Sequence, residues 1–220
     1  MTTSTSLADL ATTHPAASRV FKRLGLDYCC GGRALLADAC RTKGLDASAI
    51  LTAIEAEETL VDLPRWDTAP LADLIHFIVA RYHEALRIEL PELIALAARI
   101  EERHAEKATC PRGLRAQLER MHGAVLDHLA KEERILFPMI LAGEGPRTGG
   151  PIRIMEAEHD DHGLNLARVR ALTDDLTPPE DACPTWRALY LRLATLESEL
   201  MDHIHLENHI LFPRALRGEE

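Results

Sequence analysis

Aromatic residues, long apolar runs and basic charge are all scarce in this chain of 220 residues. Aromatics make up 4% of it, and alternating apolar runs bounded by turn residues, which are typical of β-strands, are absent. The best apolar run, residues 71–80, is broken by Asp73 and His76, and no stretch approaches the roughly 20 apolar residues of a membrane helix. We therefore expect an all-α fold and no membrane partner.

The charge balance also excludes classes of partner. Lys and Arg number 25 and Asp and Glu 35, which gives a formal net charge of −10. An acidic chain without a basic stripe is poorly suited to phosphate backbones, so we expect no nucleic acid partner. The N-terminus lacks the charged and apolar regions of a secretory signal, and the five cysteines are an odd number. Both observations favour a cytoplasmic protein with free thiols.

Helical periodicity runs through nearly the whole chain. Residues 1–58 are interpreted as a small helical N-terminal domain, with short helices at 7–10 and 17–24 and a further helix that begins after Asp46 as its N-cap. Residues 59–69 are interpreted as a linker.

Residues 70–220 are predicted to form a four-helix bundle. The expected helices cover residues 70–105, with a kink at Pro91, and residues 113–137, 152–174 and 185–211. The first two are joined by a short connection, as are the last two, so each pair should be antiparallel.

One pattern occurs twice, at residues 127–138 and 202–213, and reads D-H-x-x-x-E-x-x-I-L-F-P. A His and a Glu four residues apart lie on one helical face, about 40° apart. An imidazole and a carboxylate presented twice in this way indicate a two-metal site in a bundle. The L-F-P tails are interpreted as core packing and helix stops. Asp127 and Asp202 are either partners of the imidazoles or exposed residues.

Helix pairing selects the remaining ligands. Folding the first predicted helix onto the second places His83 level with Glu132, and folding the third onto the fourth places His159 near His203. His104 lies 21 residues after His83, about 30 Å along a helix, and is left out. The predicted ligands are His83, His128, Glu132, His159, His203 and Glu207.

The other histidines receive weaker interpretations. His162 shares part of the face of His159, so it is a candidate for a supporting or entry-path residue. His205 and His209 point away from His203 on the last helix, and His76 and His122 also lie off the predicted site.

Six nitrogen and oxygen ligands without a thiolate are too many for one tetrahedral zinc. They suit two non-haem iron ions per chain, each with two imidazoles, bridged by the Glu carboxylates. Manganese or a mixed pair of metals stays open.

Cys29 and Cys30 are adjacent, and a disulfide between neighbours is strained. Their thiols are therefore expected to act separately, on a metal, nitric oxide or an external disulfide, and Gly31 and Gly32 let the chain turn sharply beside them. The alternative is two small buried residues at a helix end. Cys40, Cys110 and Cys183 are isolated and are interpreted as structural.

The chain resembles the iron–sulfur cluster repair di-iron proteins, also called the repair-of-iron-centres family. The resemblance rests on the turn D-Y-C-C-G-G at residues 27–32, followed by two copies of H-x-x-x-E-x-x-I-L-F-P. The resemblance implies an N-terminal cysteine domain and a hemerythrin-like bundle with a di-iron centre. The same six residues match its iron ligands, and Cys29 and Cys30 match its motif thiols. The implied partners are damaged iron–sulfur proteins or their assembly machinery, with nitric oxide or dioxygen as small ligands.

Three functions compete. The first is repair of iron–sulfur clusters after nitrosative or oxidative stress, by iron donation, by nitric oxide processing, or by both. The second is a hemerythrin-like module that binds or senses dioxygen or nitric oxide, which would leave the cysteine turn without a role. The third is a structural bundle without metal. The residues do not decide whether the protein turns over as an enzyme, and they leave a homodimer open.

Overall fold

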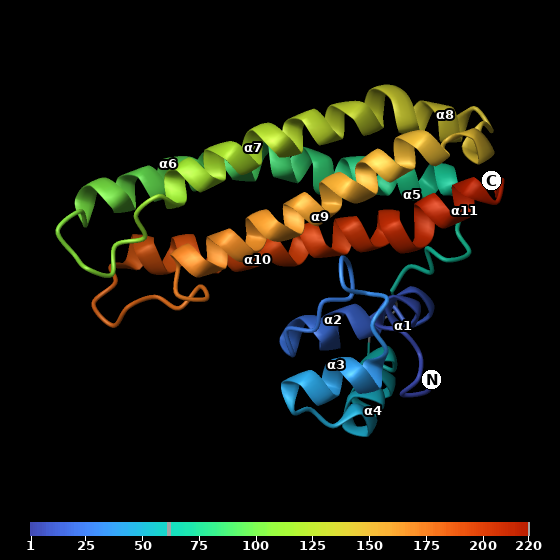
Figure 1. The fold of residues 1–220 in the computed structure, drawn as a ribbon, viewed down its shortest axis with the longest axis horizontal. Helices are drawn as coiled ribbons and strands as arrows, with labels where there is room; N and C mark the ends of the chain where they lie inside the picture. Colours follow the sequence, from blue (N-terminus) through green and yellow to red (C-terminus); the bar gives the residue numbers. More distant parts are fainter. Residues whose placement is uncertain (61–62, 220) are drawn as a thin grey trace. The chain divides into compact units, whose positions relative to one another are not determined.

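The computed structural model describes residues 1–60 and 63–219, where the regular elements are helices and a single isolated β-bridge joins Ser6 to Leu35 (Figure 1). The predicted all-α class is confirmed. Val61 and Asp62 of the predicted linker, and the last residue of the predicted bundle, lie outside the described residues. Within the described part, no helix is long and apolar enough to span a membrane.

The chain divides into two compact units. The first, called the N-terminal unit here, comprises Met1–His76, Ile140–Gly149 and Met201–Glu220. The second, called the bundle unit, comprises Phe77–Met139 and Gly150–Leu200.

The bundle unit is built from α6, α7 and the greater part of α9 and α10, which run side by side in Figure 1. Their bounds are Glu84–Arg103, Leu114–Lys131, Gly149–Leu172 and Pro184–Leu206. On α6 the buried side chains recur every three or four residues, at Leu86, Leu90, Leu93, Ala97 and Ile100. This spacing gives the helix one apolar stripe, which it buries against its neighbours. The predicted four-helix architecture is confirmed.

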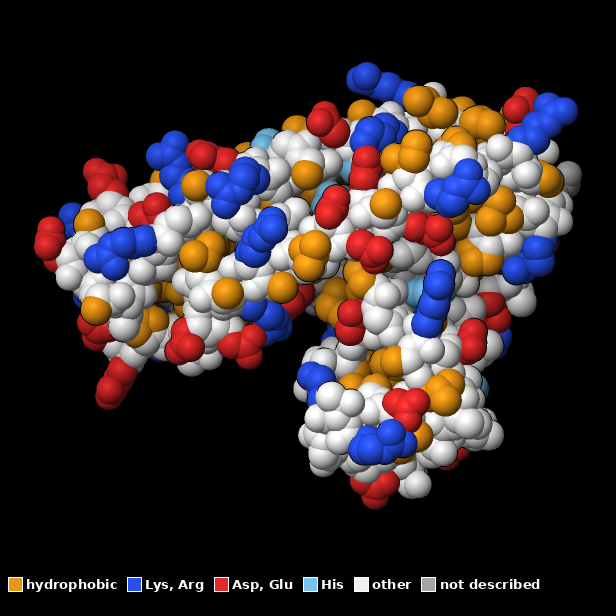
Figure 2. Space-filling model, in the orientation of Figure 1, with side chains coloured by type: hydrophobic (Ala, Val, Ile, Leu, Met, Phe, Trp, Pro, Cys, Tyr) orange, Lys and Arg blue, Asp and Glu red, His pale blue; other side chains and the backbone are white. Residues whose placement is uncertain are grey.

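Polar contacts fix how the bundle helices align. Arg192 of α10 donates to both carboxylate oxygens of Glu89 of α6, over 2.7 and 2.8 Å. The Gln117 amide of α7 donates to Asn165 of α9 over 2.9 Å. The face in Figure 2 carries acidic and basic side chains intermixed.

Three π-helical turns interrupt the long helices. They are η1 (Val79–His83) between α5 (Leu71–Ile78) and α6, η2 (Glu132–Leu136) between α7 and α8 (Phe137–Leu141), and η4 (Glu207–Leu211) between α10 and α11 (Phe212–Leu216). In each, the next N–H donates to the carbonyl five residues earlier, as Phe137 does to Glu132. Such wide turns are rare and occur frequently at functional sites.

The π turns correct the prediction that the L-F-P tails stop the helices. Pro138 and Pro213 are the second residues of α8 and α11, so each helix continues past its proline. A proline lacks the N–H and its ring crowds the carbonyl four residues earlier. The widened turn that precedes each proline relieves this conflict, so the chain stays helical.

In the N-terminal unit, residues 1–60 form the short helices α1 (Leu7–Thr13), α2 (Ala16–Arg23), α3 (Leu36–Lys43) and α4 (Ala47–Glu58). The unit also includes η3 (Gly145–Arg147), η4 and α11. Asp46 caps α4 as expected, since its carboxylate accepts from the N–H groups of Ser48 and Ala49. Helix α3 was not predicted. It buries only Leu36 and Cys40, so its apolar pattern is weak.

Within the N-terminal unit, the 27–32 turn packs against the end of α10 and against η4. The Tyr28 hydroxyl donates to Asp202 over 2.5 Å, and Lys22 lies 2.7 Å from the other oxygen of that carboxylate. His209 Nε2–H donates to the carbonyl of Cys29 over 2.7 Å, and the ring of His205 meets that of Tyr28 edge-on at 5.3 Å. Asp202 therefore anchors the N-terminal helices.

We expect Asp202→Ala to lower the free energy of unfolding by about 1–3 kcal/mol, because it leaves the Tyr28 hydroxyl and the Lys22 ammonium without their carboxylate. Asp127→Ala is the matched control, since Asp127 holds the same place in the first copy of the repeat but is exposed. It should change stability by less than about 0.5 kcal/mol. Denaturant unfolding measures both, and equal losses would contradict the anchor.

Candidate metal centre

Four of the six predicted ligands lie in the bundle unit, and all four are buried: His83, His128, Glu132 and His159. Nε2 of His83 lies 3.5 Å from Oε2 of Glu132, and Nε2 of His128 lies 3.4 Å from Oε1. Each carboxylate oxygen thus faces a different imidazole. Such a carboxylate can act as a metal ligand together with either imidazole.

His159 joins this group from α9. Its Nε2 lies 3.0 Å from Nε2 of His128. One ligand atom from each of His128, Glu132 and His159 lies within 4.8 Å of the others. Two imidazole nitrogens that close need a shared proton or a cation between them.

Two further carboxylates fix the orientation of the imidazoles. Nδ1 of His83 lies 2.7 Å from Glu133, which also pairs with Arg87, and Nδ1 of His128 lies 2.9 Å from Glu158. A carboxylate can only accept, so Nδ1–H is the donor in each pair. With Nδ1–H engaged in this way, Nε2 of each ring faces Glu132, which is the orientation that a metal ligand needs.

Both outer carboxylates are held in the charged form. Burial opposes the charge of Glu133, but hydrogen bonds from Arg87 and His83 outweigh it, so its pKa lies below the ordinary range. Glu158 behaves alike: burial is outweighed by hydrogen bonds from Lys131 and His128, and its pKa is lowered. Sequence reasoning missed both residues, although each adjoins a predicted ligand.

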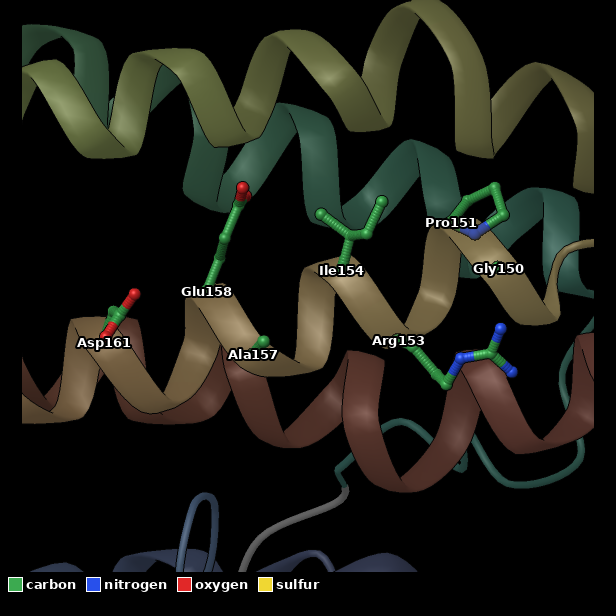
Figure 3. Close-up of a pocket in the computed structure, with 7 residues that line it drawn as sticks. All are labelled: Gly150, Pro151, Arg153, Ile154, Ala157, Glu158 and Asp161. Carbon is green, nitrogen blue, oxygen red and sulfur yellow. The ribbon is translucent and has the colours of Figure 1, made fainter.

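Glu158 also lines a surface hollow of about 730 Å³ on α9, together with residues such as Pro151 and Ile154 (Figure 3). In Figure 3 its side chain extends from α9 toward α7, where it contacts His128 and Lys131. The partner of a predicted ligand is thus accessible from the surface of the bundle unit.

The other two predicted ligands lie in the N-terminal unit. His203 is on the last turn of α10 and Glu207 is the first residue of η4. Both are buried, and Nε2 of His203 lies 2.9 Å from Oε1 of Glu207. The second copy of the repeat therefore brings its His and Glu onto one face, as the spacing predicts.

Glu132 provides the test of whether these residues fit a cation. Its carboxylate is fully buried, and among the described residues neither oxygen has a hydrogen-bond partner. A buried carboxylate without compensation is strongly unfavourable. Positive charge between its oxygens and the neighbouring imidazoles would compensate it, and donors of this kind suit iron or manganese.

The remaining histidines divide into two groups. His162 is buried, and its ring lies edge-on to that of His128 at 5.1 Å, so it belongs to the surroundings of the site. His205 and His209 face the N-terminal helices, as described above. Burial lowers the pKa of His205 to about 3, so this ring is neutral at physiological pH. Sequence reasoning placed these two off the ligand face but found no role for them.

The cysteine turn is organised by Asp27, whose carboxylate accepts from the N–H groups of Cys29, Cys30 and Gly31. Cys29 is 4% exposed and Cys30 is half-buried, with their sulfur atoms 3.7 Å apart. The hydrogen bond with Cys30, burial and the Asp27 charge all raise the pKa of the Cys29 thiol. The two thiols are therefore chemically unequal.

Gly32 allows the close approach of this turn to η4. A β-carbon at that position would overlap the carbonyl of Tyr28 and reach Nε2 of His209. Any side chain at this position would push the turn away from the segment that carries Glu207.

The chain matches two known domain families. Residues 74–215 match the family described as hemerythrin HHE cation binding domain, and residues 3–58 match a domain of unknown function, DUF542. The iron–sulfur cluster repair protein YtfE of Musicola paradisiaca is 49% identical over 217 residues, which cover 97% of each chain. Proteins of the same name from Yersinia pseudotuberculosis and Yersinia pestis are 48% identical over 215 residues, again 97% of each chain. The chain therefore belongs to the hemerythrin HHE cation-binding family and, within it, to the YtfE iron–sulfur cluster repair proteins.

Proposed function

We propose that this protein repairs iron–sulfur clusters damaged by nitrosative or oxidative stress and that its bundle holds two non-haem iron ions. The observation that carries the metal site is Glu132, a buried carboxylate whose two oxygens face two different imidazoles. The cluster-repair role is supported by the names of the relatives, which align with almost the whole chain.

We infer that His203 and Glu207 complete the site that His83, His128, Glu132 and His159 begin. Three observations support this. All six side chains are buried. The second His–Glu pair repeats the spacing of the first within one pattern. The cation-binding family spans residues 74–215, which include all six. In this assignment, Glu132 and Glu207 would supply the carboxylates that the two ions share.

Bound iron would supply one-electron chemistry, sites for nitric oxide or dioxygen, and a source of releasable metal. The residues of the chain hold and tune it. Glu133 and Glu158 keep two imidazoles in the ligand tautomer. Glu207 lies two residues before His209, whose ring donates to the Cys29 carbonyl. The thiol turn and a proposed bridging ligand are thus joined through one short segment, so events at the thiols can influence the stability of the iron site.

The ligand assignment predicts metal content. The wild-type chain should carry about two irons, and His203→Ala or Glu207→Ala should reduce this to about one or fewer, because a lost ligand leaves an incomplete site. His122→Ala, which alters a half-buried histidine of α7 outside the site, should leave it unchanged. Metal analysis by plasma emission measures this. A metal-free wild-type protein would favour the structural bundle.

The outer carboxylates give a second prediction. Glu133→Gln should weaken iron binding about 10- to 100-fold, because an amide neither carries the charge nor fixes the tautomer of His83 as a carboxylate does. Competition with a coloured chelator measures the affinity. Glu119→Gln is the control, since Glu119 pairs only with the exposed Arg115 in the described contacts. Equal affinities in the two variants would argue against a positioning role for Glu133.

Repair itself is tested with an iron–sulfur enzyme that nitric oxide has inactivated. Iron-loaded wild-type protein should restore its activity, and the Cys29→Ser, Cys30→Ser double variant should restore less, because the thiols are removed while all six proposed ligands remain. Full repair by the double variant, together with a reversible dioxygen-bound spectrum, would favour the oxygen-binding alternative.

A further inference from the structure

A thiol and an imidazole meet at one end of the bundle unit, away from the proposed metal ligands. The connection from α6 to α7 and the connection from α9 to α10 lie at this end (Figure 1). Nε2 of His104, from the first connection, lies 3.4 Å from Sγ of Cys183, from the second. Both side chains are half-buried and therefore reachable by small molecules.

We propose that Cys183, activated by His104, is the nucleophilic thiol of this protein and exchanges with low-molecular-weight disulfides. From the sequence alone, Cys183 is interpreted as structural, and His104 is left out of the predicted ligands. They are 79 positions apart, so only the folded bundle unit brings them together.

Cys183 lies at the start of a long helix. It directly precedes Pro184, the first residue of α10, a helix of 23 residues. The first N–H groups of a helix lack acceptors within it, and the helix dipole places partial positive charge at this end. Reactive cysteines are found at such helix starts and beside imidazoles, and Cys183 has both kinds of neighbour.

Surrounding contacts hold the pair in place. Lys107 donates to the Asp181 carboxylate over 2.5 Å and so ties the two connections together beside the pair. Arg187 of α10 donates to the carbonyl of Ala182 over 3.1 Å, which fixes the residue before Cys183. The ring of His104 rests on the buried Trp186 with centroids 5.0 Å apart. The imidazole is therefore positioned to accept a proton from the thiol.

The other thiols have less favourable surroundings. Cys40 and Cys110 are buried, and burial raises the pKa of each. Cys29 is buried beside the Asp27 carboxylate. Cys30 is half-buried and is the competitor that an experiment must separate from Cys183.

The exchange reaction needs only the Cys183 thiol, the His104 imidazole and the small disulfide. His104 takes the thiol proton, and the Cys183 thiolate attacks one sulfur of the disulfide. A new S–S bond forms to Cys183 as the old S–S bond breaks, and the departing thiolate takes the proton from His104. The cysteine is oxidised to a mixed disulfide, and one half of the small disulfide is reduced to a free thiol.

The test uses the full-length, metal-loaded protein and the aromatic disulfide 5,5′-dithiobis(2-nitrobenzoate) at less than one equivalent near neutral pH. Peptide mapping should find the first label on Cys183, and Cys183→Ser should abolish the fastest phase of thiol release. His104→Gln should slow this phase about tenfold or more, because it removes the proton acceptor. His122→Gln is the matched histidine control and should not change the rate.

Two results would overturn the proposal: a first label on Cys30 in the wild-type protein, or equal rates for His104→Gln and His122→Gln. Peptide mapping of the wild-type protein requires no substitution, so it identifies the first labelled cysteine even if a variant fails to fold. Retained iron content in Cys183→Ser would show that this thiol and the proposed metal site act separately.

Discussion

The carboxylate of Glu132 is the constraint on which the bundle unit depends. Its two oxygens are buried, lie 3.4 and 3.5 Å from two imidazoles and have no hydrogen-bond partner among the described side chains, so a cation beside them would compensate their burial. Glu133 and Glu158 hold two of these imidazoles by Nδ1, which leaves Nε2 directed inward. Arg87 and Lys131 in turn keep those carboxylates charged. The polar network around Glu132 is therefore arranged for a cation, while the apolar stripes of the helices stabilise the fold around it.

The repeated pattern encodes backbone geometry as well as ligands. Each copy places its Glu at the first residue of a π turn and its Pro two residues beyond the end of that turn. A wide turn changes the direction in which the Glu side chain at its first residue projects from the helix. The proline that follows disfavours regular α-helical hydrogen bonding in this turn. The L-F-P tails therefore contribute to ligand placement, although no atom of them is proposed to bind metal. The third π turn ends at His83, which lies outside the repeat.

The sequence predicted what periodicity controls: most of the helices, the face of each His–Glu pair and the level of His83 opposite Glu132. It could not predict what depends on the neighbour across a helix interface. Glu133 and Glu158 were missed because an adjacent acidic residue looks like a solvated one. Cys183 and His104 were interpreted separately because they are 79 positions apart and come together only in the folded bundle unit. Helix α3 was missed because two buried positions in eight residues form too weak a pattern.

Comparison of the two copies shows how one segment serves two purposes. His203 and Glu207 repeat His128 and Glu132, but Ala130 is replaced by His205 and Arg134 by His209. The replaced positions are those that face Tyr28 and Cys29 in the N-terminal unit. The second copy therefore has the same His–Glu face as the first and, in addition, presents His205 and His209 to the thiol turn. Because Glu207 lies between the two replaced residues, a displacement of Cys29 must act on the backbone that carries Glu207. This coupling rests on covalent adjacency within η4 and on one hydrogen bond, so it requires no direct contact between a thiol and the proposed metal site.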